Sequence, residues 1–382
     1  MEFHPYTYIK EGRNNMRKAF ISPTKYVQGE GALNDLGAYV SLYGKSALLI
    51  AHKDDAARVK AQLDYTSKET GVTFVTSNFG GECSRQEVAR LKEVAAKANC
   101  DVVIGLGGGK AIDTAKCVAD SVKPVIICPT IAATDAPTSS SAVLYTPEGA
   151  FDDYAYFISN PNVVLVDTAV IAMAPARFLV SGMGDALSTY FEARSCRAAY
   201  ARVNASGHGR PAAVGTMTAM ALATLCYETL LEDGYKAKVA CECKVVTPAL
   251  ENIVETNILL SGLGFESGGL AAAHAVHNGL TVLEETHRFF HGEKVAFGTI
   301  VHLVLENAPA SELKTVIDFC KSVGLPTCLK DLGVTVVTKE KIMAVAKTST
   351  AEGESIYNMP FPVTAETVYA AILAADKLGS AL

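Results

Sequence analysis

The stretch Asp101-Val-Val-Ile-Gly-Leu-Gly-Gly-Gly-Lys-Ala-Ile-Asp-Thr-Ala-Lys116 decides the fold. It reads as an apolar strand, a turn of consecutive glycines and a helix that begins near Lys110. Glycines let the backbone approach a pyrophosphate closely, and the free N–H groups of a helix N-terminus favour negative charge. The spelling matches neither G-x-G-x-x-G nor a P-loop. The stretch therefore predicts a phosphate site, with a tight strand-to-helix turn that binds nothing as the alternative.

On both sides of this stretch, short β-rich runs alternate with helical stretches. Strands are expected at 46–51, 72–76, 101–106, 124–128 and 162–166. Apolar residues recur at helical spacing over 54–70 and 84–98, which we expect to be helices that cross over between strands. This alternation is typical of a parallel sheet wrapped by helices.

After Pro175 the β-rich runs largely disappear and long segments rich in Ala, Leu and Met follow. Helices are expected within 212–231, 236–260, 293–307 and 365–378. The Gly- and Pro-containing stretch 201–211 is expected to be an exposed loop. We therefore predict an α/β domain over residues 1–173 and an all-helical domain over 174–382.

Composition limits the class of ligand. With 382 residues, 49% of them apolar, the chain is long enough for two domains that each bury a core. A net charge of −6 without a Lys/Arg block argues against nucleic acid and acidic membranes as partners. The apolar runs are strand-sized and shorter than the roughly 20 residues of a membrane span. The ten cysteines are scattered, and the first residues, Met1 to Tyr6, show no signal-peptide features. Both observations predict a cytoplasmic protein. The ligand is expected to be a small molecule.

A second loop follows the next expected strand. Residues 129–141 are rich in Thr, Ser and Pro. Ligands of open α/β sheets collect at the carboxyl ends of strands, so this loop and the glycine turn are expected to face one ligand. By composition alone, an ordinary surface loop is the alternative.

Half of the chain's eight histidines lie between residues 274 and 291. They are His274, His277, His287 and His291. Neutral imidazole is the commonest protein ligand of zinc and similar ions. The cluster predicts a metal site, whereas histidines that only form hydrogen bonds on a helix face are the alternative.

Several ordered motifs carry a family resemblance. They are 79–83 (FGGEC), 107–116 (GGGKAIDTAK), 134–137 (TDAP), 184–187 (GDAL), 264–269 (GFESGG), 274–279 (HAVHNG) and 291–298 (HGEKVAFG). With these motifs the chain resembles the iron-containing alcohol dehydrogenase superfamily, most closely its zinc-dependent glycerol dehydrogenase branch. The resemblance implies an N-terminal, Rossmann-like dinucleotide-binding α/β domain and an all-α C-terminal domain, an architecture shared with dehydroquinate synthase, with the active site between them.

The resemblance also implies the metal ligands. They map onto Asp185, His274 and His291, with a position left for water or substrate, as a catalytic zinc requires. Iron-dependent relatives add a histidine one helical turn after the aspartate, where this chain has Thr189, and this favours zinc. Asp135 is similar to the family residue that contacts substrate hydroxyls, and His274 is expected beside the substrate. The expected catalytic set is thus Asp135 together with the three ligands.

By the same resemblance the cofactor is NAD. The residues expected around its pyrophosphate are Gly108, Gly109, Lys110 and Asp113, and those on the nicotinamide side are Thr130, Ala133, Ser139, Ser141 and Tyr145. The family usually has Ser at position 133. It also usually has an acidic residue where His52 stands, at the adenosine ribose, and a histidine there removes the repulsion of a 2′-phosphate. NADP therefore stays open beside NAD, with Asp54 or Asp55 as substitute carboxylates.

The implied reaction is oxidation of glycerol and related vicinal diols to ketones such as dihydroxyacetone, with NAD accepting the hydride and zinc activating the alcohol. The family resemblance further implies a homo-oligomer, with an octamer among the family's assemblies. Three alternatives stay open: a dehydrogenase of another polyol or of phosphorylated glycerol, a lyase like dehydroquinate synthase, and a nucleotide-binding protein without turnover.

Overall fold

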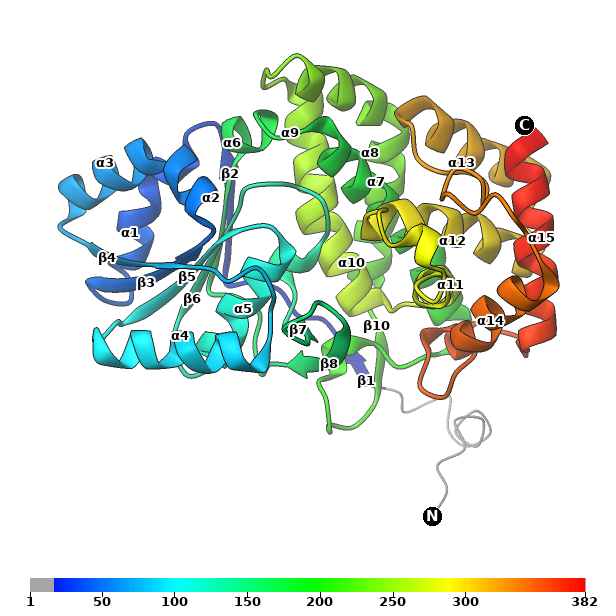
Figure 1. Ribbon diagram of the computed structural model, residues 1–382, viewed down its shortest axis with the longest axis horizontal. Coiled ribbons are helices and arrows are strands. Elements are labelled where there is room, and N and C mark those ends of the chain that lie inside the picture. The colour runs from blue at the N-terminus through cyan, green and yellow to red at the C-terminus, as the bar shows by residue number, and fades with distance from the viewer. Residues whose placement is uncertain (1–16, 382) are drawn as a thin grey trace.

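The computed structural model describes residues 17–381. Figure 1 shows a half built around a sheet, blue to cyan, beside a half built from helices, green to red. Two sequence-based statements concern residues outside the described range. One is that the sequence suggests no function for the N-terminal extension, and the other is that Met1 to Tyr6 lack signal-peptide features. None of the helices in the described range is both long and apolar enough to cross a membrane.

Six parallel strands form the main sheet, in the order β2-β9-β6-β5-β3-β4. Their bounds are β2 (Lys25–Gly29), β3 (Ser46–Ala51), β4 (Thr73–Asn78), β5 (Val102–Gly107), β6 (Val125–Pro129) and β9 (Val163–Asp167). The expected strands and their parallel arrangement are confirmed. The sequence did not predict β2, because this edge strand is only partly buried and lacks a continuous apolar run.

Helices cover the sheet between these strands. They are η2 (Ala32–Asp35), α1 (Leu36–Val40), α2 (Lys53–Arg58), α3 (Lys60–Thr70), α4 (Arg85–Lys97) and α5 (Gly109–Ala119). The helix expected at 54–70 is broken at Val59, which leaves the helical conformation and is fully buried. α4 begins as expected, because the Ser84 side chain accepts a hydrogen bond from the backbone N–H of Glu87.

Alternate residues of the strands enter two different buried clusters. On β3, Leu49 faces the cluster under α1 and α3, whereas Leu48 and Ile50 face the opposite side. This second cluster continues without a break into the helical half, where it includes Leu187 and Phe297. The second cluster therefore joins the two halves, whereas the buried members of the cluster with Leu49 all lie within residues 32–170. The predicted boundary at 173/174 falls between helices and stays a prediction.

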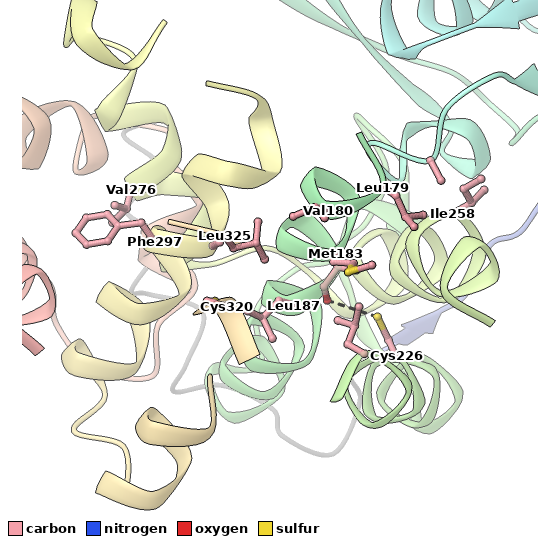
Figure 2. Packing of buried hydrophobic residues seen from close by; sticks show 14 of the residues in the cluster. Leu179, Val180, Met183, Leu187, Cys226, Ile258, Val276, Phe297, Cys320 and Leu325 are labelled. Carbon is pink, nitrogen blue, oxygen red and sulfur yellow. Dashed lines mark hydrogen bonds between the residues drawn. The ribbon is translucent and has the colours of Figure 1, made fainter. Parts of the chain in front are cut away.

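The helical half contains most of the remaining chain. Its elements are α6 (Thr168–Ala172), α7 (Ala176–Ala199), α8 (Met217–Glu242), α9 (Pro248–Glu255), η5 (Thr256–Leu260), α10 (Ser261–Gly268), α11 (Ala272–Leu280), α12 (His291–Leu305), α13 (Ala310–Val323), α14 (Lys339–Ser349) and α15 (Ala365–Ala381), with short 3₁₀ turns η4 (Asn204–Ser206), η6 (Glu284–Thr286) and η7 (Ser355–Asn358). Figure 2 shows α7 at the centre of the shared core, with Leu179 beside Ile258 of η5.

The expected break near residues 231–236 is absent, because α8 runs through it. Gly234 lies within α8, at the point where α13 packs against it. A Cβ on Gly234 would be 2.7 Å from the ring of Phe319, so the glycine permits the close approach of the two helices. α8 instead ends before Lys244, which has a positive φ of 60°, and Thr247 caps α9.

Short strands interrupt the expected pattern at two places. β10 (Ala213–Gly215) pairs in parallel with β1 (Arg17–Ala19), so the segment expected to be helical from 212 begins as a strand and α8 starts at Met217. The all-helical description of the second half thus holds apart from β10. β7 (Ser141–Tyr145) and β8 (Phe151–Tyr156) form a hairpin that the sequence did not predict. In Figure 1 this hairpin lies between the two halves.

Candidate active site

The glycine turn lies at the carboxyl edge of the sheet, between β5 and α5. A Cβ on Gly105 would lie 2.7 Å from the Cβ of Ala115, so this glycine is required for α5 to pack on β5. A Cβ on Gly109 would meet nothing closer than 3.9 Å, so Gly109 faces open space where a ligand can approach. The Gly107 carbonyl accepts a hydrogen bond from the backbone N–H of Thr130 at 3.0 Å. The glycine turn and the second loop are thus neighbours, as expected.

Lys110 and Tyr145 form one rim of this turn. The Lys110 Nζ donates to Glu82 Oε1 at 2.6 Å and lies 4.9 Å from the centre of the Tyr145 ring. Burial, followed by the charge of Asp113, raises the pKa of Tyr145 to about 12. Because Lys110 forms an ion pair with Glu82, its charge is already partly balanced within the protein.

The buried side chain of Lys116 holds the loop over residues 130–141. It is 2% exposed, and its Nζ donates to Asp113 Oδ1 at 3.1 Å and to Ser139 Oγ at 3.1 Å. It also donates to the carbonyls of Ala136 at 2.6 Å and Ser141 at 2.8 Å. Burial raises the pKa of Asp113, against the opposing effect of Lys116. Asp113 and Ser139, expected at the cofactor, thus have partners inside the protein.

The helical half holds the same loop from the other side. The Asn257 side chain donates to the Ala132 carbonyl at 3.0 Å. Glu266 Oε1 accepts from the backbone N–H of Ser140 at 2.8 Å and from its hydroxyl at 2.5 Å. Burial raises the pKa of Glu266, which these hydrogen bonds oppose. The loop that carries Thr130 and Ala133 is therefore fixed between both halves of the molecule.

Asp135 extends from this loop to the helical half. Its Oδ2 accepts from the hydroxyl of Ser261 at 2.7 Å, and its backbone N–H faces Asp185 Oδ2 at 3.4 Å. Burial, followed by the charge of Asp185, raises its pKa well above the usual value. The expected substrate-binding carboxylate thus lies next to the expected metal ligands.

Three helices bring Asp185, His274 and His291 together. Asp185 lies on α7, His274 on α11 and His291 at the first residue of α12, and one donor atom from each lies within 4.8 Å of the others. Gly292 makes this possible, because a Cβ there would lie 1.8 Å from the carbonyl oxygen of Ser181. The glycine beside the ligand thus lets α12 cross α7 at this point.

The spacing of the donor atoms fits a metal ion. Asp185 Oδ1 lies 3.3 Å from His274 Nε2 and 3.1 Å from His291 Nε2. In a tetrahedral site with metal–ligand bonds of about 2.0 Å, neighbouring donors lie about 3.3 Å apart. Two imidazole nitrogens and a carboxylate are also the ligand types of catalytic zinc. The residues therefore fit the metal that the sequence predicts.

The charges of the cluster favour the same conclusion. Burial alone would raise the pKa of Asp185, but His291 and His274 outweigh it and lower that pKa. Burial alone would lower the pKa of His274, but Glu192 and Asp185 raise it well above the usual value. Buried carboxylates of this kind require a compensating positive charge, which a bound cation can supply.

Glu192 is a site residue that the sequence did not reveal. It is fully buried, and its Oε2 accepts from His274 Nδ1 at 2.6 Å. Its Oε1 accepts from the backbone N–H groups of Ala271 at 2.8 Å and His274 at 3.0 Å. Seven residues, two helical turns, separate it from Asp185, so both lie on one face of α7. That spacing was the available signal.

The other residues of the sequence cluster lie outside the triad. His277 Nε2 lies 3.0 Å from His291 Nδ1, behind the ligand ring. The His287 side chain contacts the Thr281 carbonyl at 2.9 Å. Thr189, at the position of the iron-dependent relatives' extra histidine, forms a 3.0 Å hydrogen bond with Ser261.

His52 follows β3, at the position expected for the adenosine ribose. Its half-exposed ring caps α2 by accepting from the backbone N–H of Asp54 at 3.4 Å. The neighbouring Asp55 reaches the glycine turn, where its Oδ2 would lie 3.6 Å from a Cβ on Gly107. Arg58 lies 3.6 Å from the other oxygen of Asp55. Of the two substitute carboxylates, Asp55 is therefore the one beside the turn.

Comparisons with known proteins identify the family of this chain. Residues 23–168 match the family model described as iron-containing alcohol dehydrogenase. A glycerol dehydrogenase of Thermotoga maritima is 52% identical, with coverage of 94% of this chain and 97% of the relative. One of Escherichia coli O6:H1 is 48% identical, with coverage of 95% and 98%.

The fold of this chain is also similar to that of a solved structure. The crystal structure of glycerol dehydrogenase from Schizosaccharomyces pombe superposes with a TM-score of 0.89 at 40% identity, covering 96% of this chain and 92% of that one. The similarity spans both halves of the molecule and therefore includes the sheet, the loops and the helices that carry the triad. The chain belongs to the iron-containing alcohol dehydrogenase family.

Proposed function

We propose that the protein is an NAD-dependent, zinc-dependent glycerol dehydrogenase. The observation that carries the proposal is the Asp185, His274 and His291 cluster, next to a glycine turn at the sheet edge. Relatives that are about half identical over nearly their whole length are glycerol dehydrogenases. In the reaction, the hydride on the secondary carbon of glycerol passes to NAD, the hydroxyl proton is released, and dihydroxyacetone and NADH form.

The metal would be held by the three residues of the cluster. When bound, zinc supplies a Lewis acid that lowers the pKa of the alcohol. Three protein ligands leave a position for the substrate. Thr189, which is bonded to Ser261, stands where iron-dependent relatives have a histidine, so α7 adds no third imidazole to the site, and this supports zinc over iron.

The other residues bind and orient. Ser261 holds one oxygen of Asp135, and the second oxygen is proposed to accept a hydrogen bond from a further hydroxyl of the diol. The turn at Gly108 and Gly109 would accommodate the pyrophosphate at the N-terminus of α5. The loop with Thr130 and Ala133, fixed from both halves, would orient the nicotinamide ring toward the substrate carbon.

NAD is proposed over NADP because of Asp55. Its carboxylate lies beside Gly107 and would accept a hydrogen bond from the ribose and repel a 2′-phosphate. His52 stands at the usual acidic position without that repulsion. A cytoplasmic location and a homo-oligomer, with the octamer as one form, also stay predictions.

The test is the initial rate of NADH formation from glycerol and NAD by metal-stripped protein. Added zinc should restore turnover, and ferrous iron should restore much less. His274→Ala should bind no zinc and show no turnover, while it still binds NAD. NAD binding without NADH formation under any metal would favour the lyase alternative, and a zinc-free active variant would refute the ligand assignment.

A further inference from the structure

A chain of hydrogen bonds leads from His291 away from the proposed metal position. His291 Nδ1 lies 3.0 Å from His277 Nε2, and His277 Nδ1 lies 3.0 Å from Asn278 Oδ1. The Asn278 amide nitrogen donates to both carboxylate oxygens of Glu354, at 3.0 and 3.3 Å. The chain thus joins a proposed ligand to a carboxylate 63 residues later in the sequence.

The carboxylate at the end fixes the direction of every bond in the chain. An ionised carboxylate only accepts, so the NH₂ group of Asn278 must face Glu354 and its oxygen must face His277. That oxygen accepts, so His277 carries its proton on Nδ1 and presents a lone pair on Nε2. His291 must then donate from Nδ1. Its Nε2 is thereby the nitrogen left to bind a metal.

The position of Glu354 is itself well defined. The next residue, Ser355, donates from its hydroxyl to the Ala271 carbonyl at 2.7 Å, and Asn358 donates to the Leu270 carbonyl at 2.8 Å. These bonds attach η7 to the segment that precedes His274. Tyr154 of the β7–β8 hairpin lies beside Asn278 and Glu354. Burial, followed by the charges of Glu354 and Tyr156, raises the pKa of Tyr154, and a hydrogen bond with Asn278 opposes that rise.

We propose that Glu354 is a positioning residue of the metal site, which acts through Asn278 and His277 to keep His291 in the tautomer that presents Nε2. This inference rests on the proposed metal site. The second histidine is held in the same way but directly, because Glu192 accepts from His274 Nδ1 at 2.6 Å. Both proposed histidine ligands then have a carboxylate behind the Nδ1–H, once in direct contact and once through two intermediate side chains.

The experiment measures zinc affinity by competition with a chromophoric chelator, together with the visible spectrum of the cobalt-substituted protein. Glu354→Ala removes the final acceptor and should raise the zinc Kd about tenfold, the lower range for an outer partner of a metal ligand. It should also alter the cobalt spectrum. Glu352→Ala, an exposed glutamate on the same segment, is the matched control and should change neither readout.

A double variant tests the order of donors. In Asn278→Asp combined with Glu354→Gln, the carboxylate is one step nearer and still accepts from His277, while the new amide donates to it. The order along the chain is preserved, so zinc affinity and the cobalt spectrum should return close to those of the unmodified protein. If Glu354→Ala does not fold, Asn278→Ala breaks the same chain and should give the same loss.

Two outcomes would overturn the proposal that Glu354 positions His291. One is an unchanged zinc Kd in Glu354→Ala, and the other is a double variant that binds zinc as weakly as Glu354→Ala. Failure of the proposed function looks different: the unmodified protein would then bind no zinc, or would bind it equally after Asp185→Asn.

Discussion

Each half of the site is organised by one buried charged side chain, and the two have opposite roles. In the α/β half, Lys116 donates to the Ala136 and Ser141 carbonyls and so shapes a loop of backbone. In the helical half, Glu192 accepts from His274 Nδ1 and so orients a single side chain. A surface for a dinucleotide is made from backbone, which needs a donor to hold its carbonyls. A metal site is made from imidazoles, which need an acceptor behind them.

Lys116→Met should have the largest effect, on stability. It leaves Asp113 buried without its cation, a change that typically costs about 3 to 5 kcal/mol of unfolding free energy. Urea denaturation of the metal-free protein measures it. Lys110→Met, at an exposed ion pair with Glu82, is the control and should change stability by less than about 1 kcal/mol. Equal stability of the two variants would show that Lys116 does not organise the loop.

Glu192→Gln should have the next largest effect, on the metal. The glutamine oxygen can accept from the backbone N–H groups of Ala271 and His274, and its NH₂ then faces His274 Nδ1. The ring must change tautomer and carry its proton on Nε2, so zinc affinity should fall about 100-fold. Chelator competition measures the fall, with the exposed Glu232→Gln as control. An unchanged zinc Kd would show that Glu192 does not orient His274 for the metal.

Two glycines, Gly105 on β5 and Gly109 at the start of α5, distinguish helix packing from ligand binding. Gly105→Ala brings a Cβ against Ala115 and should lower stability by about 2 kcal/mol. Gly109→Ala meets no atom of the protein within 3.9 Å, so stability should be unchanged while NAD affinity falls about tenfold. Thermal unfolding and NADH fluorescence titration measure the two effects. Normal NAD binding by Gly109→Ala would place the pyrophosphate elsewhere.

Asp55→Asn should have the smallest effect, on cofactor choice. Removal of a partly exposed charge is worth less than about 1 kcal/mol, so the ratio of kcat/KM for NAD over NADP should fall about threefold. Asp54→Asn, whose side chain is 78% exposed, should leave the ratio unchanged. If both variants or neither change it, Asp55 does not discriminate between the cofactors.

The sequence predicted most elements of the sheet but fewer details of the helical half. Apolar runs bounded by turns located β5 and β6 within a residue or two, because such runs fold locally in one way. The expected break between residues 231 and 236 was wrong, because α8 continues there and Gly234 packs against Phe319 of the distant helix α13. The β7–β8 hairpin was missed for a similar reason, since it packs on parts of the chain that no local pattern reveals.

The sequence by itself determined the strand, glycine turn and helix at residues 101–116, and its family resemblance indicated the candidate ligands, Asp185, His274 and His291. Only the tertiary structure decided how these residues are supported. Glu192 meets His274 across 82 residues, and His291 meets Asp185 across 106. A backbone turn depends on neighbouring residues, whereas the partner of a buried polar group depends on which helices pack together. For that reason the buried Lys116 and Glu192 and the partly buried Glu354 emerged as supporting residues only from the folded chain.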